Sequence, residues 1–168
     1  MTPRDRDRDQ AGRPRNARPR DAFGRPLEHG ATGESRIPDD LSLPPAEAIA
    51  LAQELLDSGR PFQAHEVLEA SWKSAPDAER DLWQGLAQVA VGLTHAQRGN
   101  ARGAAALLRR GAGRVSGYLP GADDAGRYGI DVPGIIRSAG ELAARIERDG
   151  LDSVTQGDLR LRLRAVAG

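Results

Sequence analysis

The chain has 168 residues, of which 39% are hydrophobic and 29% charged, and its formal net charge is zero. This length suits one domain with a small core, and the balanced charge gives no general attraction to nucleic acid or to anionic membranes. The lack of cysteine excludes disulfides and thiolate chemistry, and no apolar run reaches the roughly 18 residues that a membrane span needs. No apolar segment of a secretory signal is present near Met1, so the protein is predicted to be cytoplasmic.

Residues 1–40 form the first predicted unit, a disordered leader. They alternate Arg with Asp, Pro and Gly and hold almost no large apolar side chains, so they bury too little surface to offset the entropy of ordering. An arginine-rich arm is also a pattern that binds RNA, but the interleaved Asp5, Asp7 and Asp9 weaken that interpretation. Nucleic-acid binding is therefore not expected.

Residues 41–150 form the second unit, which is predicted to be all-α, a compact bundle of about five helices joined in antiparallel hairpins. Proline at position 45 suits a first helical turn, and Gly59 suits the end of that helix. Further helices are expected over 61–74, 77–98, 101–118 and 132–148, because Pro, Gly, Asn and Asp interrupt the pattern between them.

Residues 151–168 form a partly ordered tail. Leu159, Leu161 and Leu163 alternate with arginines there, which is compatible with a short strand or with a final helical turn.

The helix over 61–74 carries ionisable side chains at helical spacing. His65, Glu69 and Trp72 follow i, i+4, i+7 spacing and share one face, with Phe62 before them and Glu66 beside them. Groups of this kind are costly to bury, so they need partners or a purpose.

The next helix has its own polar face, made of Gln84, Gln88 and His95. A short connection predicts an antiparallel hairpin, which would bring the start of one helix to the end of the other. We therefore expect His65, Glu66 and Glu69 to converge with Gln88 and His95, with Arg98 as a nearby counter-charge.

Three interpretations of this constellation remain open. In the first, the groups satisfy one another in a structural polar network. In the second, His65, His95 and either Glu66 or Glu69 hold a divalent metal, although Glu at position 69 breaks the His-Glu-x-x-His signature. In the third, the groups form a pocket without metal, either for an uncharged ligand or for acid–base catalysis by His65, Glu66, Glu69 and His95, and desolvation beside Trp72 raises the proton affinity of Glu69.

Asn100 follows a helix-ending glycine and is expected to cap the next helix. The surrounding Arg98-Gly-Asn-Ala-Arg-Gly103 is similar to a phosphate-binding turn only in outline, since a Gly stop and an Asn start explain the same letters.

The chain resembles the bacterial and archaeal domain-of-unknown-function family DUF309 over about residues 45–118. The letters that carry this resemblance are Phe62, Ala64-His65-Glu66-Val67-Leu68-Glu69, Trp72, Gln84-Gly85-Leu86-Ala87-Gln88, His95 and Arg98-Gly99-Asn100. The leader and the composition resemble actinobacterial members. The resemblance implies a compact bundle of about five helices, and it implies no activity.

Together, these patterns predict a small, soluble, non-enzymatic interaction module that binds a protein partner or a second copy of itself. Its pocket or groove would be lined by Phe62, Trp72, Gln84, Gln88, Arg98 and Asn100. No cofactor is predicted. The alternative is a small-molecule hydrolase that uses a divalent metal or a carboxylate–histidine acid–base site.

Overall fold

A computed structural model describes residues 37, 42–118 and 127–165. Within these ranges the chain forms five α-helices and four short 3-10 turns, with one isolated β-bridge and no longer strand. The elements are α1 (Pro45–Asp57), α2 (Pro61–Ser74), η1 (Asp77–Glu79), α3 (Arg80–Gln97), α4 (Ala101–Gly117), η2 (Arg127–Gly129), α5 (Val132–Asp149), η3 (Leu151–Ser153) and η4 (Gly157–Leu159). The all-α class is confirmed, and the predicted leader lies outside the described residues apart from Ile37.

The helix ends follow local chemistry. Gly59 and Gly99 have φ values of 73° and 80°, the left-handed conformation that glycine adopts without steric cost after a helix. Asn100 caps α4 by accepting a hydrogen bond from the Gly103 amide at 3.0 Å, as the sequence predicted. The start of α3 differs from the prediction, because a 3-10 turn takes up residues 77–79 and the α-helix begins at Arg80.

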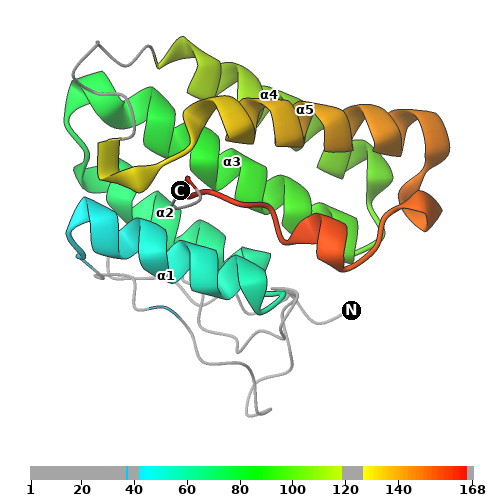
Figure 1. Ribbon diagram of the computed structural model, residues 1–168, viewed down its shortest axis with the longest axis horizontal. Helices are drawn as coiled ribbons and strands as arrows, with labels where there is room; N and C mark the ends of the chain where they lie inside the picture. Colours follow the sequence, from blue (N-terminus) through cyan, green and yellow to red (C-terminus); the bar gives the residue numbers. More distant parts are fainter. Residues whose placement is uncertain (1–36, 38–41, 119–126, 166–168) are drawn as a thin grey trace, which may run out of the picture.

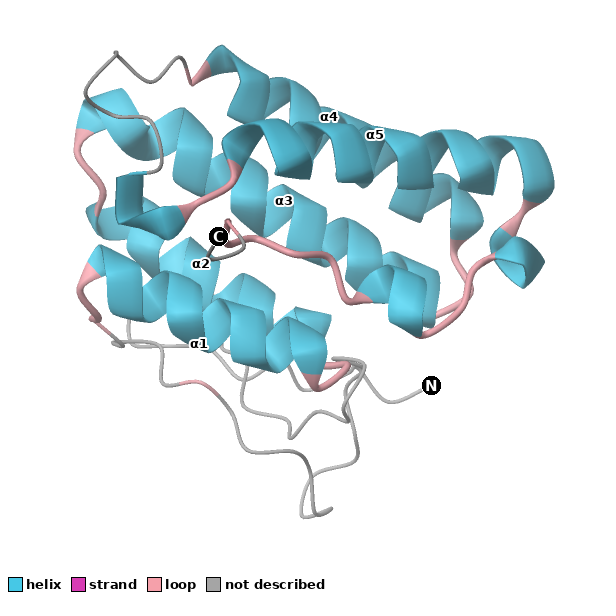
Figure 2. Ribbon diagram, viewed as in Figure 1, coloured by secondary structure: helices cyan, strands magenta, loops and turns pink. Residues whose placement is uncertain are grey.

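The helices pack in chain order, each against the next, with α3 in the middle of the bundle (Figures 1 and 2). In these views α1 and α2 lie on one side of α3, and α4 and α5 lie on the other. Contacts at both ends of the α2–α3 pair, described below, confirm the predicted antiparallel hairpin. Because α3 has neighbours on two sides, its apolar side chains are largely buried, including Trp83, Leu86 and Leu93. No described helix is both long and apolar enough to cross a membrane.

Helices α3 and α4 approach closely where glycines face each other. A methyl group added to Gly111 would lie 2.7 Å from the carbonyl oxygen of Gly85, and one added to Gly85 would lie 2.9 Å from the carbonyl oxygen of Gly111. These contacts are shorter than van der Waals distance, so neither position has room for a side chain unless the helices separate.

Residues 159–165, here called the C-terminal strap, cross the bundle between α1 and α5 (Figure 1). Leu159 ends η4, Arg160 forms a bend with ψ 61°, and the chain continues outside helix and turn from Leu161. Leu159, Leu161 and Leu163 are buried, so the alternation seen in the sequence corresponds to one inward face. The strap pairs with the residues before α5 through an antiparallel bridge between Ile130 and Arg164. The tail is therefore strand-like after its short 3-10 turns.

Candidate functional site

The outer side of α2 carries the first group of predicted site residues. Their helical spacing places Phe62, His65, Glu66, Glu69 and Trp72 along one side, and each is partly exposed. We call these five residues the α2 face. The opposite side of α2 is buried in the bundle, so this face is the part of the helix that another molecule can reach.

His65 and Glu69 form the centre of the α2 face. The Nε2 atom of His65 lies 3.2 Å from a carboxylate oxygen of Glu69, and Lys73 lies 3.9 Å from the other oxygen. Because a carboxylate only accepts hydrogen bonds, Nε2 carries the proton in this contact. The second ring nitrogen, Nδ1, is buried and has no hydrogen-bond partner.

The protonation of Glu69 differs from the expectation. The hydrogen bond from His65 lowers the pKa of Glu69 below its ordinary value, and it outweighs burial, which acts in the opposite direction. The prediction that desolvation beside Trp72 raises the pKa of Glu69 is therefore wrong. Glu69 is a carboxylate that orients His65.

An arginine covers the aromatic ring at each end of the α2 face. The Arg98 guanidinium, after the end of α3, lies 5.8 Å from the Phe62 ring centre, and the Phe62 ring lies 5.6 Å from the His65 ring. At the other end, the Arg80 guanidinium lies 5.7 Å from the Trp72 ring centre. Both distances are within the range of cation–π attraction. Arg98 is thus close to the α2 face, as expected.

The polar face of α3 does not join the α2 face. The side chain of Gln88 accepts a 3.4 Å hydrogen bond from Arg114 of α4. His95 contacts Asn100, with its Nδ1 atom 3.1 Å from the side-chain amide nitrogen. Gln84 shares this side of α3 by helical spacing and is partly buried. The predicted convergence of Gln88 and His95 with His65 and Glu69 is therefore wrong, because α3 turns that stripe toward α4.

The predicted metal ligands are likewise not gathered. Among the described residues, no three His, Asp or Glu side chains are placed to hold one ion, so His65, Glu69 and His95 do not form a ligand set. Burial and the nearby charge of Arg98 both lower the pKa of His95, which leaves its imidazole neutral over a wider pH range.

The buried carboxylate of Glu79 was not predicted from the sequence. Glu79, in the turn before α3, is 5% exposed and accepts hydrogen bonds from Trp83 Nε1 at 3.3 Å, Arg127 at 3.3 Å and the Tyr128 hydroxyl at 3.2 Å. Burial and this carboxylate raise the pKa of Tyr128. The i, i+4 spacing of Glu79 and Trp83 was the one local sign in the sequence that these two side chains could pair. The other partners of Glu79, Arg127 and Tyr128, are distant in sequence. These contacts fasten the turn after the undescribed segment 119–126 to the α2–α3 connection.

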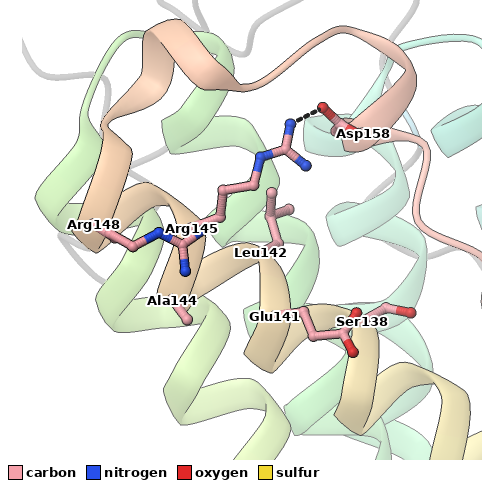
Figure 3. Close-up of a pocket in the computed structure, with 7 residues that line it drawn as sticks. All are labelled: Ser138, Glu141, Leu142, Ala144, Arg145, Arg148 and Asp158. Carbon is pink, nitrogen blue, oxygen red and sulfur yellow. Dashed lines mark hydrogen bonds and ion pairs between the residues drawn. The ribbon is translucent and has the colours of Figure 1, made fainter.

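A surface hollow of about 440 Å³ lies beside α5, away from the α2 face. Its charged residues do not converge: Arg145 reaches Asp158, whereas Arg148 and Glu141 project elsewhere (Figure 3). Arg145 donates to Asp158 at 2.6 Å and also to the Ser153 carbonyl. The hollow is therefore bordered by an anchor for the C-terminal turns, and we do not assign it a ligand.

Comparison with known proteins places these features in a family context. Residues 49–107 match the family model described as Domain of unknown function (DUF309). A stretch of 48 residues is 44% identical to the Uncharacterized protein YpuF of Bacillus subtilis (strain 168), and it spans 28% of this chain and 28% of that protein. No solved structure is significantly similar to the chain. The family match confirms the resemblance, and its range contains the whole α2 face.

Proposed function

We propose that this protein of the DUF309 type is a helical interaction module whose docking site is the α2 face. One observation carries the proposal: two partly exposed aromatic rings, Phe62 and Trp72, each lie under an arginine guanidinium on the same side of one helix. Aromatic and arginine side chains dominate the binding energy of protein interfaces.

Phe62 is the more informative of the two rings. Trp72 packs in part against the hydrophobic core, whereas Phe62 is not among the described residues that form or line that core. Phe62 contacts His65 and Arg98 at the surface, so its partly exposed ring offers apolar area to a partner.

The α2 face suggests an occupant by its length and charge. Phe62 and Trp72 are ten residues apart, which is about 15 Å along a helix at about 1.5 Å per residue. Arg98 and Arg80 place positive charge at the two ends. An amphipathic helix of a protein partner, with apolar anchors three turns apart and an acidic residue beside each, complements this arrangement.

The test uses a labelled helical peptide with two leucines eleven positions apart on one face and a glutamate next to each. Fluorescence anisotropy should show binding to the full chain, and Phe62→Ala should weaken it about tenfold or more, since truncating an anchor costs more than about 1.4 kcal/mol. The matched control is Leu55→Ala, a partly buried apolar residue of α1 that packs on the core. A peptide with lysines in place of the glutamates should bind less. Equal binding of both peptides, or no effect of Phe62→Ala, would refute the proposal.

A hydrolase using His65 and Glu69 is the second candidate. The supporting observation is that Glu69 holds Nε2 of His65 and leaves Nδ1 without a hydrogen bond, as a general base requires. Because Nδ1 is buried, a substrate reaches it less easily than the α2 face, and we rank the hydrolase below the docking proposal. Ester hydrolysis above background that disappears in both His65→Gln and Glu69→Gln would support it, and activity unchanged in both variants would exclude it.

A further inference from the structure

The C-terminal strap displays a row of charge that the proposed function does not use. Arg160, Arg162 and Arg164 are exposed and alternate with the buried leucines. Within the part of the chain that the structure describes, their side chains make no hydrogen bond or ion pair. We call these three residues the arginine ladder.

The backbone that carries the arginine ladder is held from one side by a buried glutamine. Gln53 of α1 is 4% exposed, and its amide nitrogen donates to the Leu161 carbonyl at 3.2 Å while its amide oxygen accepts from the Leu163 amide at 2.6 Å. These are the two groups that a neighbouring parallel strand would engage. The side chain of Gln53 thus replaces a strand along this edge.

Further hydrogen bonds hold the end of the strap and the turn before it. The Asp131 amide donates to the Leu163 carbonyl at 2.8 Å, and the Ala165 amide donates to the Gly129 carbonyl at 2.9 Å. Before the strap, Asp158 is fixed by Arg145 and by the Thr155 amide at 2.8 Å. The ladder is therefore pre-organised, and a ligand need not order the chain that presents it.

The ladder has a defined repeat. Residues two apart in an extended chain are separated by about 6.6 Å, since each residue advances by about 3.3 Å. This spacing applies to Arg162 and Arg164, and Arg160 precedes them at the bend after η4. An extended peptide with a carboxylate at every second residue has the same repeat, and guanidinium groups pair with carboxylates in a planar, two-bond geometry. The Leu161 carbonyl, the Leu163 amide and carbonyl and the Ala165 amide already have hydrogen-bond partners within the protein, so we assign recognition to the arginine side chains and not to strand addition.

Single-stranded nucleic acid fits this surface less well. Proteins that bind it without sequence preference stack its bases on aromatic side chains beside the basic groove. The strap contains no aromatic residue, and no described aromatic side chain is fully exposed.

We propose that the arginine ladder of the C-terminal strap binds an extended acidic segment of a partner protein, with carboxylates at alternate positions. This site lies on the strap between α1 and α5 and is independent of the α2 face.

The test measures binding of a fluorescein-labelled peptide of Asp-Ser repeats to the full chain at low salt. Arg160→Gln combined with Arg164→Gln should weaken binding about 5- to 30-fold, as expected for two exposed ion pairs of about 0.5–1 kcal/mol each. Arg102→Gln combined with Arg110→Gln removes the same charge from exposed positions on α4 and should change binding less than about twofold. A peptide of the same composition with its aspartates in one block should bind more weakly.

Each other outcome has a defined meaning. Equal loss of binding in the two double variants would show that net charge and not the ladder attracts the peptide, and it would overturn the proposal. Oligothymidylate that binds more tightly than the peptide, and that loses binding in the Arg160/Arg164 variant, would replace the acidic segment by nucleic acid. If the Asp-Ser peptide does not bind to the wild-type chain, the proposal is also refuted. All substituted arginines are exposed, so melting temperatures should be unchanged and serve as the folding control.

Discussion

Replacing Gln53 by alanine should loosen the C-terminal strap more than any surface change nearby. The side-chain amide of Gln53 is the hydrogen-bond partner of the Leu161 carbonyl and of the Leu163 amide, and its oxygen also lies 3.3 Å from the Arg164 amide. Alanine removes all of these contacts and leaves space in a buried position.

The cost follows from the groups left behind. Each buried backbone group that loses its partner costs about 1–3 kcal/mol, so the Leu161 and Leu163 groups together account for about 2–6 kcal/mol. For a domain of this size, about 3 kcal/mol corresponds to a melting temperature lower by about 10 °C. Gln53→Leu should lower the free energy of unfolding by nearly as much as Gln53→Ala. Leucine fills the space but leaves the same backbone groups without a hydrogen bond.

Thermal melting and hydrogen exchange together test this reasoning. The Leu163 and Arg164 amides should exchange faster in Gln53→Ala, whereas amides within α3 should change only as much as global stability does. The matched control is Gln84→Ala, because the Gln84 side chain makes no hydrogen bond within the described residues. A loss of less than about 1 kcal/mol in Gln53→Ala would refute the idea that this amide holds the strap.

Two further predictions test the packing and the centre of the α2 face. Gly111→Ala should destabilise the protein by about 1–3 kcal/mol, because its new methyl group would lie 2.7 Å from the Gly85 carbonyl oxygen. Gly113→Ala is the matched control, because a methyl group added at Gly113 meets no atom within 4 Å, and it should stabilise the protein by up to about 1 kcal/mol. Stabilisation by both, measured by urea unfolding, would contradict the close helix approach. The hydrogen bond from His65 depresses the pKa of Glu69 in the folded state, so its contribution to stability is present above the unfolded-state pKa and is lost as pH falls through the folded-state pKa. The stability difference between wild type and Glu69→Gln should therefore shrink in acid, and a difference that does not vary with pH would argue against the pair.

The sequence determined the helices because the signals for helix ends are local. Glycine at positions 59 and 99 and asparagine at 100 act on their immediate neighbours, so their effect can be judged without tertiary structure. The i, i+4 spacing of His65 and Glu69 likewise sufficed to pair them, since both lie on one helix. The same spacing placed Phe62 and Trp72 on one face.

Only the tertiary structure decided which surfaces meet across helices. The polar stripe of Gln88 and His95 has the same spacing whichever way α3 is rotated in the bundle, and the rotation depends on apolar packing on both sides of that helix. Glu79 became a buried carboxylate because Arg127 and Tyr128 return to it from almost fifty residues away in the chain. The tail remained ambiguous between strand and helix for the same reason: the partners that hold it extended, Gln53 and residues 129–131, are distant in sequence, and contacts of that kind leave no local periodicity.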